Sequence, residues 1–462
     1  MANRKPFLIQ TVLAVAACKA ARAALRLAHR GGTALPGKAA MVFARNILQV
    51  TAAGMEIVVV TGTNGKTTTA RMLEHAFSQG GRPVLANKSG ANLLSGVTAE
   101  LTANATWRGR PRTHYAVIEC DEGALKQVVP LIRPKVIVVT NLFRDQLDRY
   151  GEVLHTLEAI RTGVRLTPES VLCLNADCSL TASLAQDVPN RVVYYGLDAA
   201  TGDQSERELS DARHCLKCGA VYRYRYHTYA HLGGFYCPQC GYARPEPAVA
   251  VTAIESMSAS GTRVRLRIGD KEQTVRIGLP AVYNIYNAAA AVTAYRAFGL
   301  PVQEAVDSLG DVRSCFGRME TFDLGGVPVQ MILVKNPAGC NQALEYLEAL
   351  EQPFAAVFCL NDRTADGHDI SWIWDAEYER FVEKSQVQAI FVSGERAEDM
   401  QLRLKYAGVP EERVTMEKDS ARLVERLRAS KLQVFVLPNY TSMLALRQVL
   451  GEACGKKEFW KG

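Results

Sequence analysis

The feature that most constrains this chain is a glycine-rich turn placed directly after a short apolar run. Residues 57–60 are apolar, and the turn that follows reads Thr61-Gly62-Thr63-Asn64-Gly65-Lys66-Thr67-Thr68-Thr69. A buried strand that leads into such a turn, and then into a helix, directs backbone N–H groups at a polyphosphate. We therefore predict an ATP-binding loop in which Lys66 is the mobile cation and the Thr67 hydroxyl faces Mg²⁺. The predicted nucleotide contacts of this loop are Gly62, Thr63, Asn64, Gly65, Lys66, Thr67 and Thr68.

The loop departs from the general pattern G-x-x-x-x-G-K-[ST], because Val60 stands where the first glycine is expected. The alternative is a plain glycine turn between a strand and a helix at 68–78. Gly-Lys-Thr at such a junction is typical of phosphate binding, which favours the nucleotide loop.

The net charge of +7 comes from the N-terminal segment. Residues 1–50 hold eight Lys or Arg and no Asp or Glu, which leaves 46 basic and 47 acidic residues in the remainder. Apolar residues are interleaved with these charges, as in a basic amphipathic helix that lies on an anionic surface.

The same segment imitates an export signal, because Arg4 and Lys5 precede an apolar run at 7–18. That run is shorter than the roughly 20 residues that span a bilayer, and an ATP site needs cytosolic nucleotide. We predict a cytoplasmic protein that lies peripherally at the inner face of the membrane.

Apolar runs and helical patterns alternate along the chain. Predicted strands at 57–60, 84–85, 115–119, 136–140 and 171–174 indicate a parallel α/β sheet covered on both faces. Residues 249–277 alternate as antiparallel strands do, and 280–297 indicate a helix. A second α/β series has strands at 329–334, 355–360, 389–392 and 434–437, with helices at 341–349 and 421–429.

A chain of 462 residues is too long for a single core. We predict a basic amphipathic arm at 1–50, a central ATP-binding domain at 51–320 and a Rossmann-like domain at 321–462.

Four of the twelve cysteines are paired by their spacing. Cys215-x₂-Cys218 and Cys237-x₂-Cys240 are separated by eighteen residues, which is the spacing of a four-thiolate zinc site. Two redox pairs are the alternative. Because four thiolates leave no open position on the metal, we predict a structural Zn²⁺ ribbon at 211–245, inserted in the central domain. The other cysteines are expected to be small buried hydrophobes.

The basic and aromatic run at 222–226 lies between the two halves of this ribbon. Tyrosines and arginines can stack on bases and pair with phosphates, which would suit a nucleic-acid module. Alternating Tyr and Arg is also the pattern of a half-buried strand, and we favour the strand, with no nucleic-acid partner.

Carboxylates follow the predicted strand at 115–119. Glu119, Asp121 and Glu122 come at its end, at the edge of the sheet that also carries the phosphate loop. Carboxylate oxygens are the ligands Mg²⁺ requires beside phosphates. A polar segment beginning at Thr140 and Asn141 follows the next strand and adds to the same edge.

Five motifs, in this order along the chain, resemble those of the Mur ligase superfamily. They are Gly62-Thr63-Asn64-Gly65-Lys66-Thr67, Thr140-Asn141-x₃-Asp145-x-Leu147-Asp148-x-Tyr150-Gly151, Leu174-Asn175-x-Asp177, Asn284-x₂-Asn287 and Gly317-Arg318-x-Glu320. The resemblance covers about residues 55–330. It implies a Mur ligase-type domain with a parallel sheet, and acyl-phosphate chemistry in which ATP phosphorylates a carboxylate and an amine attacks the mixed anhydride.

The resemblance also implies roles for residues of this chain. Lys66 and Thr67 would hold the β- and γ-phosphates and Mg²⁺, and Glu119 would bind Mg²⁺. Asn141 would complete the nucleotide site, Asn284 and Asn287 would hold the adenine, and Arg318 would approach the nucleotide from the domain junction.

Three departures narrow this resemblance. Only about fifty residues precede the loop, so no domain for a UDP-linked substrate is expected. Gln146 stands where a histidine commonly occurs, and Lys335-Asn336-Pro337 stands in the segment that usually reads D-Y-A-H-N-P. Ordinary amino-acid addition is therefore doubtful.

One branch of the superfamily combines this core with a four-cysteine ribbon and a C-terminal domain like the one here, which carries Asn361-Asp362-x₃-Asp366-Gly367-x-Asp369. Its members are ligase subunits that amidate the α-carboxylate of D-glutamate in lipid II, with ammonia from a GatD-like glutaminase. The resemblance implies that a carboxylate of this domain completes the glutaminase triad, and we expect Asp362, with Asp366 and Asp369 as alternates. Turn residues are the other interpretation of these aspartates.

The chain shows no Cys–His pair in an amidotransferase setting, which fits ammonia from a partner. Asn439-Tyr440-Thr441 is expected to be a loop, either plain or facing that partner. Two competing functions are a free-standing ligase that adds an amino acid to a nucleotide- or folate-linked substrate, and a zinc-ribbon ATPase that acts on nucleic acid.

Overall fold

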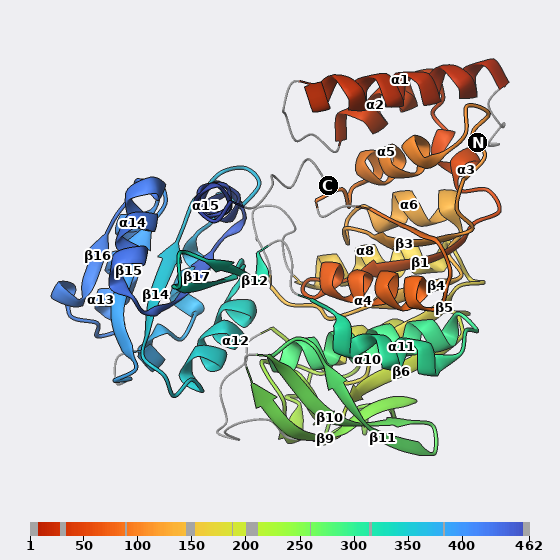
Figure 1. Cartoon of the computed structure of the whole chain (residues 1–462). Helices are drawn as coiled ribbons and strands as arrows, with labels where there is room; N and C mark the ends of the chain where they lie inside the picture. Colours follow the sequence, from red (N-terminus) through yellow and green to blue (C-terminus); the bar gives the residue numbers. More distant parts are fainter. Residues whose placement is uncertain are drawn as a thin grey trace. The chain divides into compact units, whose positions relative to one another are not determined.

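The computed structural model describes residues 8–27, 34–87, 90–144, 153–186, 188–199, 211–258, 260–313, 317–381 and 384–455. The chain divides into two compact units (Figure 1). Unit 1 comprises Met1–Phe143 and Val153–Val312, and unit 2 comprises Arg144–Glu152 and Arg313–Gly462.

Unit 1 is built on a nine-stranded sheet with the order β11-β10-β9-β6-β5-β4-β1-β3-β2. Its strands are β1 (Glu56–Thr61), β2 (Val84–Ala86), β3 (Tyr115–Glu119), β4 (Val136–Val139), β5 (Val171–Asn175), β6 (Val192–Leu197), β9 (Val249–Ser258), β10 (Gly261–Ile268) and β11 (Lys271–Ile277). Strands β2 to β6 and β1 run parallel, β9 continues parallel to β6, and β10 and β11 are antiparallel.

Helices cover the parallel part of this sheet. They are α4 (Lys66–Gln79), α5 (Leu94–Asn104), α6 (Leu125–Ile132), α8 (Val153–Arg165), α9 (Ser179–Ala182), α10 (Val282–Ala297) and α11 (Val302–Ser308). Helices α4, α10 and α11 pack together on one face, and α6 packs on α8 on the other (Figure 1). Strand β4 is buried throughout and β3 is buried after Tyr115, as expected for a parallel sheet covered on both faces.

The order of these strands explains where a ligand can bind. The chain goes from β1 outward to β2 and returns through β3, then crosses to β4 on the other side of β1. Right-handed crossovers place the helices of these two directions on opposite faces. The carboxyl end of β1 is therefore a topological switch point, which is where open α/β sheets bind ligands.

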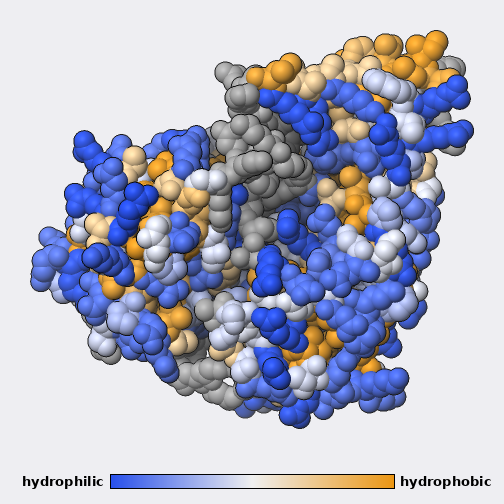
Figure 2. Space-filling view, in the orientation of Figure 1, coloured by the Kyte–Doolittle hydropathy of each residue, from blue (hydrophilic) through white to orange (hydrophobic). Residues whose placement is uncertain are grey.

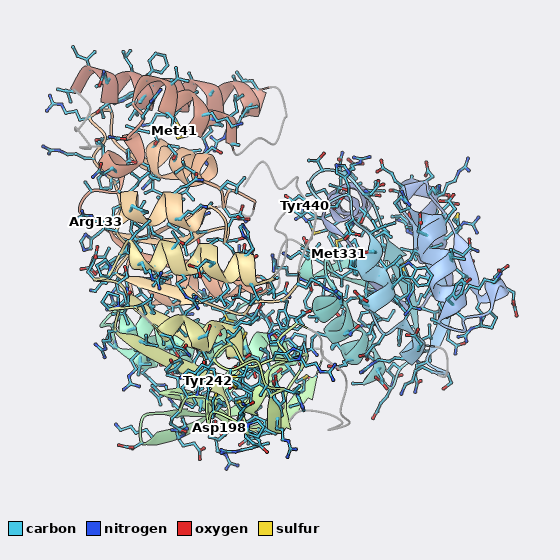
Figure 3. All side chains as sticks on the ribbon, turned by 180° about the vertical axis from the view of Figure 1, so that it is seen from behind. Met41, Arg133, Asp198, Tyr242, Met331 and Tyr440 are labelled. Atoms are coloured by element: carbon cyan, nitrogen blue, oxygen red, sulfur yellow. The ribbon has the colours of Figure 1, made fainter. Side chains whose placement is uncertain are left out.

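Three N-terminal helices form a further layer of unit 1: α1 (Leu8–Leu27), α2 (Ala34–Phe43) and α3 (Ile47–Thr51). Helix α1 packs on α2, and α2 packs on α5. Ala14, Val15 and Cys18 of α1 are buried with Ala40 of α2. The side chain of Met41, also on α2, contacts Thr98 of α5 (Figure 3). Among the described residues, α1 is the one helix that has the length and composition to cross a membrane, a property that core helices and signal sequences share.

The cysteine module of unit 1 contains a two-stranded antiparallel sheet, β7 (Arg223–His227) with β8 (Gly233–Tyr236). The prediction that the Tyr/Arg run forms a strand is confirmed for Arg223–His227. Two of its tyrosines are used in hydrogen bonds within the fold. Tyr224 donates to the His231 carbonyl at 3.1 Å, and Tyr226 donates to the Leu197 carbonyl at the end of β6 at 2.8 Å.

Unit 2 has a six-stranded sheet with the order β12-β13-β17-β14-β15-β16. Its strands are β12 (Arg318–Asp323), β13 (Pro328–Ile332), β14 (Phe354–Cys359), β15 (Val387–Ser393), β16 (Val414–Met416) and β17 (Gln433–Pro438). Its helices are α12 (Pro337–Glu348), α13 (Ala397–Tyr406), α14 (Ser420–Ser430) and α15 (Tyr440–Ala453). Only β12 is antiparallel to its neighbour, and Met331 of β13 lies in the core of this unit (Figure 3).

The parallel α/β series predicted for each half of the chain is confirmed. Strands β6, β12 and β16 and helices α5, α13 and α15 were not predicted. The expectation of a loop after residue 438 is wrong, because α15 begins at Tyr440 with Asn439 before it. Tyr440 is labelled in Figure 3.

Candidate active site

The phosphate loop of unit 1 has a backbone that requires glycine. Gly62 and Gly65 have φ values of +118° and +86°, in the region that side chains disfavour. A Cβ on Gly62 would lie 2.8 Å from the Asn141 carbonyl oxygen, and one on Gly65 would lie 2.1 Å from Asn287 Oδ1. The loop is therefore packed against both β4 and α10, and it leads directly into α4.

Asn141, which follows β4, holds this loop in place. Its side-chain oxygen accepts from the Asn64 amide at 2.9 Å, and its carbonyl accepts from the Thr63 amide at 2.9 Å. Thr140 Oγ1 donates to the Asn64 carbonyl at 2.7 Å. The structure thus brings Asn141 together with the loop, as predicted, through contacts to its backbone.

Lys66 is buried and folds back over the loop. Its Nζ lies 2.5 Å from the Gly62 carbonyl and 2.9 Å from Glu122 Oε1. Burial lowers the pKa of Lys66, but the carboxylates of Glu122, Glu119 and Asp121 outweigh it, so the pKa is raised. A lysine held charged in this position can transfer its contacts from Glu122 to a phosphate without changing protonation state.

Thr67 and Glu119, the residues predicted to hold magnesium, lie side by side. Thr67 Oγ1 donates to Glu119 Oε2 at 2.7 Å, and Asn92 Nδ2 donates to Glu119 Oε1 at 3.4 Å. Both residues are buried at the carboxyl edge of the sheet. A hydroxyl and a carboxylate side by side are oxygen ligands of the kind Mg²⁺ takes beside phosphates, so these residues fit the metal. Thr68 is half-buried and takes no part in this pair.

Asn284 and Asn287 lie on α10, the helix behind the loop. Asn287 Oδ1 accepts from Thr69 at 3.3 Å, and its Nδ2 donates to Asn284 Oδ1 at 3.2 Å. Asn284 Nδ2 donates to the Pro280 carbonyl at 2.6 Å. The structure therefore places Asn287 against the loop and Asn284 one turn before it, both buried.

Asp177, after β5, joins α10 to the cysteine module. Its carboxylate accepts from Tyr286 of α10 at 2.5 Å, from Arg244 Nε at 2.6 Å and from the Leu197 amide at 2.8 Å. Burial raises the pKa of Asp177, and Arg244 opposes that shift without cancelling it. The sequence indicates Asp177 only as part of a motif. Its ion pair with Arg244 could not be predicted, because Arg244 lies 67 residues further along the chain.

A Cys–His contact lies beside this ion pair. Cys178 Sγ and His231 Nε2 are 3.4 Å apart, and both residues are buried. Burial raises the pKa of Cys178, but His231 outweighs it and the thiol pKa is lowered; burial lowers the pKa of His231, but Cys178 raises it on balance. This buried contact is not the amidotransferase-type nucleophile pair that the sequence was expected to lack, because both side chains are closed off from solvent. The pair fastens the β7–β8 turn to the start of α9.

The four predicted zinc ligands gather in one cluster. The sulfurs of Cys215, Cys218, Cys237 and Cys240 all lie within 4.8 Å of one another, and tetrahedral zinc would set them roughly 3.8 Å apart. Gly219 and Gly241 turn the two knuckles with φ values of +76° and +73°. The donor set and its size fit a four-thiolate metal.

In unit 2, Asp362 follows β14 and has an accessible side chain. Arg396 Nη1 donates to its Oδ2 at 3.0 Å, and 32 % of the Asp362 side chain is exposed. His368 Nδ1 lies 2.7 Å from the Asp362 carbonyl oxygen. The carboxylate is fixed from one side and open on another.

Asp366 and Asp369 are used within the fold. Asp366 is buried and accepts hydrogen bonds from both the amide, at 2.7 Å, and the hydroxyl of Thr441, the second residue of α15. Burial raises the pKa of Asp366. Asp369 accepts from the Ser371 amide at 2.8 Å, and the Ser371 hydrogen bonds lower its pKa. For these two aspartates the turn interpretation describes the contacts.

Arg318 opens β12 in unit 2. Its Nε is buried and has no hydrogen-bond partner within the described residues. Glu320 of the same motif accepts from Arg447 Nε and Nη2, at 2.8 and 2.9 Å, and from the Gly317 amide. Glu320 thus shapes the turn that presents Arg318. Asp145, Gln146, Asp148 and Tyr150 lie outside the described residues.

The fold and this site define an ATP-binding P-loop protein of the Mur ligase class. Residues 60–233 match the family "Mur ligase middle domain", and residues 333–443 match "MurT ligase C-terminal". The chain belongs to the MurT family, the subunits of lipid II isoglutaminyl synthases.

Two relatives carry this assignment. The "Lipid II isoglutaminyl synthase (glutamine-hydrolyzing) subunit MurT" of Streptococcus pneumoniae is 35 % identical over 445 residues, which is 96 % of this chain and 97 % of the relative. The protein of the same name from Staphylococcus aureus is 34 % identical over 95 % of this chain and 98 % of the relative.

A solved structure agrees on the fold. The pseudomurein peptide ligase type C of Methanothermus fervidus superposes with a TM-score of 0.65, covering 86 % of this chain and 79 % of that chain, at 20 % identity. The prediction of a Mur ligase-like α/β fold with parallel sheets is confirmed.

Proposed function

We propose that this chain is the ATP-dependent ligase subunit of a two-protein enzyme that amidates lipid II. The α-carboxylate of D-glutamate in the stem peptide would attack the γ-phosphorus of ATP, giving an acyl phosphate and ADP. Ammonia would then attack the acyl carbon and expel phosphate, leaving D-isoglutamine. The observation that carries this proposal is the similarity to a MurT subunit, at 35 % identity over 96 % of this chain. The contacts that hold the loop with Asn141, Lys66, Thr67 and Glu119 in unit 1 support it.

The residues of unit 1 divide this work. Backbone amides of the loop and Lys66 would hold the β- and γ-phosphates, and Thr67 with Glu119 would hold Mg²⁺, which shields the charge that moves to the leaving ADP. Asn284 and Asn287 would position the adenine, and Arg318 would meet the nucleotide as an additional cation. Because Glu122 already neutralises Lys66, an arriving phosphate exchanges one anion for another.

Ammonia would come from a GatD-like glutaminase bound as a heterodimer through the domain at 321–462. Asp362 would orient the catalytic His of that partner and stabilise its cationic form. The support is that Asp362 is held by Arg396 and is partly exposed, whereas Asp366 is buried and bonded to Thr441. Asp369 is also partly exposed, and it accepts from the Ser371 amide two residues further on.

We further propose that the four cysteines hold a structural zinc ion within a ribbon at 211–245, inserted in a central domain at 51–320. A closed set of four thiolates stabilises the fold and offers no position for a substrate. The protein would be cytoplasmic and peripheral at the membrane, where lipid II is.

The experiment that tests this function is reconstitution with the glutaminase, ATP, Mg²⁺ and lipid II, read out as amidated lipid II by mass spectrometry. Amidation with glutamine or with ammonium chloride is the expected result. ATP hydrolysis stimulated by DNA or RNA, with no amidation, would support the nucleic-acid alternative, and attachment of an amino acid by the chain alone would support the free-standing ligase.

A further inference from the structure

Helix α1 turns an apolar face to solvent. Its exposed residues are Leu8, Ile9, Gln10, Leu13, Ala20, Ala23, Ala24, Arg26 and Leu27. Ile9 is 74 % and Leu27 is 83 % exposed, and Val42 of the neighbouring α2 is 79 % exposed. Figure 2 shows hydrophobic residues along the outer edge of the molecule over α1, with hydrophilic residues below them. Soluble proteins seldom leave such an apolar face uncovered, and it marks an interaction site.

Two basic residues of α1 point away from this face. Lys19 donates to the Ala105 carbonyl at 2.9 Å, and Arg22 pairs with Glu100 at 3.4 Å. Because Lys19 and Arg22 are used against α5 and the loop after it, the outer face keeps its apolar character.

A second, independent feature lies beside α1. The loop after α5 carries Trp107, which is 56 % exposed, and three exposed arginines, Arg108, Arg110 and Arg112. A Cβ on Gly109 of this loop would lie 2.7 Å from the Thr11 side chain, and Lys19 Nζ lies 4.7 Å from the Trp107 ring centroid. Trp107 and Gly109 therefore lie against α1, at Lys19 and Thr11, and bring the exposed arginines of the same loop close to this helix.

The charge of this surface has one sign. There is no Asp or Glu in residues 1–55 or in residues 101–118, and Glu100 between them is paired with Arg22. Apolar residues below the headgroups, Trp at the interface and Arg beside phosphates are the composition with which proteins bind an anionic membrane.

We propose that the outer face of α1 and α2, together with the loop Trp107 to Arg112, docks this protein on a membrane rich in anionic lipid. This membrane-docking surface deepens the peripheral location proposed above and rests on it. Helix α1 lies in the interface plane and stays packed on unit 1, because Thr11, Ala14, Val15 and Cys18 are buried there. A spanning helix would lose those contacts and carry Lys19 and Arg22 into hydrocarbon.

The test uses the full chain and vesicles of phosphatidylcholine with or without phosphatidylglycerol, and no lipid II. The wild type is expected to sediment with the anionic vesicles, and its binding should weaken as salt rises. Ile9→Glu/Leu13→Glu should bind roughly tenfold or more weakly, because two carboxylates replace buried apolar area. The matched control is Leu166→Glu, at an exposed leucine outside the surface, which should bind as the wild type does.

Two more readouts locate the contact. Arg108→Gln/Arg112→Gln should lose most of the preference for anionic vesicles. Tryptophan emission should shift to the blue on binding, and the shift should disappear in Trp107→Phe. Binding of Ile9→Glu/Leu13→Glu that equals wild-type binding would overturn the proposal. Two other results would also overturn it. One is a dimer that dissociates when Ile9 and Leu13 are substituted, which would make this face a protein–protein interface. The other is membrane-bound protein that alkaline carbonate does not extract, which would indicate that α1 spans the bilayer.

The membrane-docking surface and the proposed amidation can be tested separately. Ile9→Glu/Leu13→Glu should still amidate lipid II with ammonium in detergent micelles, where no bilayer is needed. Loss of vesicle binding with full micellar activity supports the membrane-docking surface. If the wild type does not amidate lipid II in detergent micelles, the proposed function is rejected instead.

Discussion

The phosphate-binding edge of unit 1 and the acidic segment after β14 in unit 2 hold their carboxylates in different ways. At the edge, Glu119 and Glu122 are buried and paired with Thr67 and Lys66. In the acidic segment, Asp362 is partly exposed and paired with an arginine that is itself 38 % exposed. In the first arrangement both carboxylates are bonded to residues beside the loop, whereas the second leaves a carboxylate available to another protein. Buried pairs are expected where one chain performs a reaction, and an accessible, fixed carboxylate is expected where a partner completes it.

The largest effect that would sharpen this comparison is expected for Asp362→Asn. If the carboxylate serves the partner, glutamine-driven amidation should fall by roughly 10³–10⁴-fold, as for loss of the orienting carboxylate of a triad. Ammonium-driven amidation should stay near the wild-type rate, because unit 1 is unchanged. The measurement is the rate of lipid II amidation with each nitrogen source.

The matched control is Asp399→Asn, which removes the other carboxylate bound to Arg396 and should leave both rates near wild type. Equal loss with both nitrogen sources in Asp362→Asn would remove the role in the triad.

Lys66→Ala should break the other side of the comparison. Removal of the cation at the phosphates is expected to slow amidation by about 10²–10³-fold, and equally with glutamine and with ammonium. Lys135→Ala, at an exposed lysine that pairs with Glu56, is the control. An effect of Lys66→Ala on glutamine-driven amidation alone would contradict the assignment of the phosphate site.

The same variant has an expected pH dependence. The pKa of Lys66 is raised above its ordinary 10.5 in the folded state, so the stabilisation from its charge is present below that value and is lost as pH rises through the folded pKa. The difference in unfolding free energy between wild type and Lys66→Ala should therefore be constant from about pH 7 to pH 9. A difference that changes within this range, measured by urea unfolding, would show that the lysine titrates there.

Arg244→Met tests whether the cysteine module supports the phosphate edge. It leaves the Asp177 carboxylate buried without its cation, which typically costs about 3–5 kcal/mol of stability. Because Asp177 also binds Tyr286 of α10, we expect the KM for ATP to rise several-fold with a smaller change in kcat. Arg265→Met, which breaks an exposed pair with Glu255, should cost less than about 1 kcal/mol.

Should Arg244→Met lower stability while leaving the KM for ATP unchanged, Asp177 would hold the fold and would not position α10 for the nucleotide. Differential scanning fluorimetry and initial-rate kinetics on the same preparations distinguish these outcomes.

The smallest effect on catalysis is expected for Cys218→Ser. Loss of one thiolate should remove bound zinc and lower the melting temperature, because metal binding free energy is folding free energy in such sites. The rate of amidation at a temperature where the variant is folded should remain within about twofold of wild type, since a closed thiolate set takes no part in the chemistry. Cys454→Ser, outside the cluster, is the control, and zinc is measured by atomic emission.

A soluble, metal-free Cys218→Ser protein with the melting temperature of wild type would contradict a structural zinc ion. A large loss of kcat in fully folded Cys218→Ser protein would contradict the prediction that the zinc site takes no part in the reaction.

Much of the fold could be predicted from short patterns in the sequence. The apolar run of β1, the Gly-Lys-Thr of the loop and the carboxylate at the end of β3 are each readable within a few residues, and together they placed the phosphate edge. The paired C-x-x-C spacing located the cysteine cluster in the same way. Helices such as α5 and α13 were missed because their composition is not strongly amphipathic, and β12 because Arg318–Asp323 contains three charged residues.

The contacts that decide roles are long-range and left no local signal. Asp366 is occupied by Thr441, 75 residues later, and Cys178 meets His231 across 53 residues. The Trp107 loop lies beside α1 only because α5 packs on α2, so the membrane-docking surface combines segments that are far apart in the sequence. That Asp366 is the buried one of the three aspartates, and which helix face stays uncovered, follow from tertiary packing.

The central claim is that this chain activates the carboxylate of lipid II as an acyl phosphate. The most direct measurement uses lipid II labelled with oxygen-18 in the D-glutamate α-carboxylate, with the chain, its glutaminase, ATP and glutamine. The account predicts that each amide formed is accompanied by one inorganic phosphate carrying one oxygen-18 atom. Unlabelled phosphate, released while the amide forms, would contradict it.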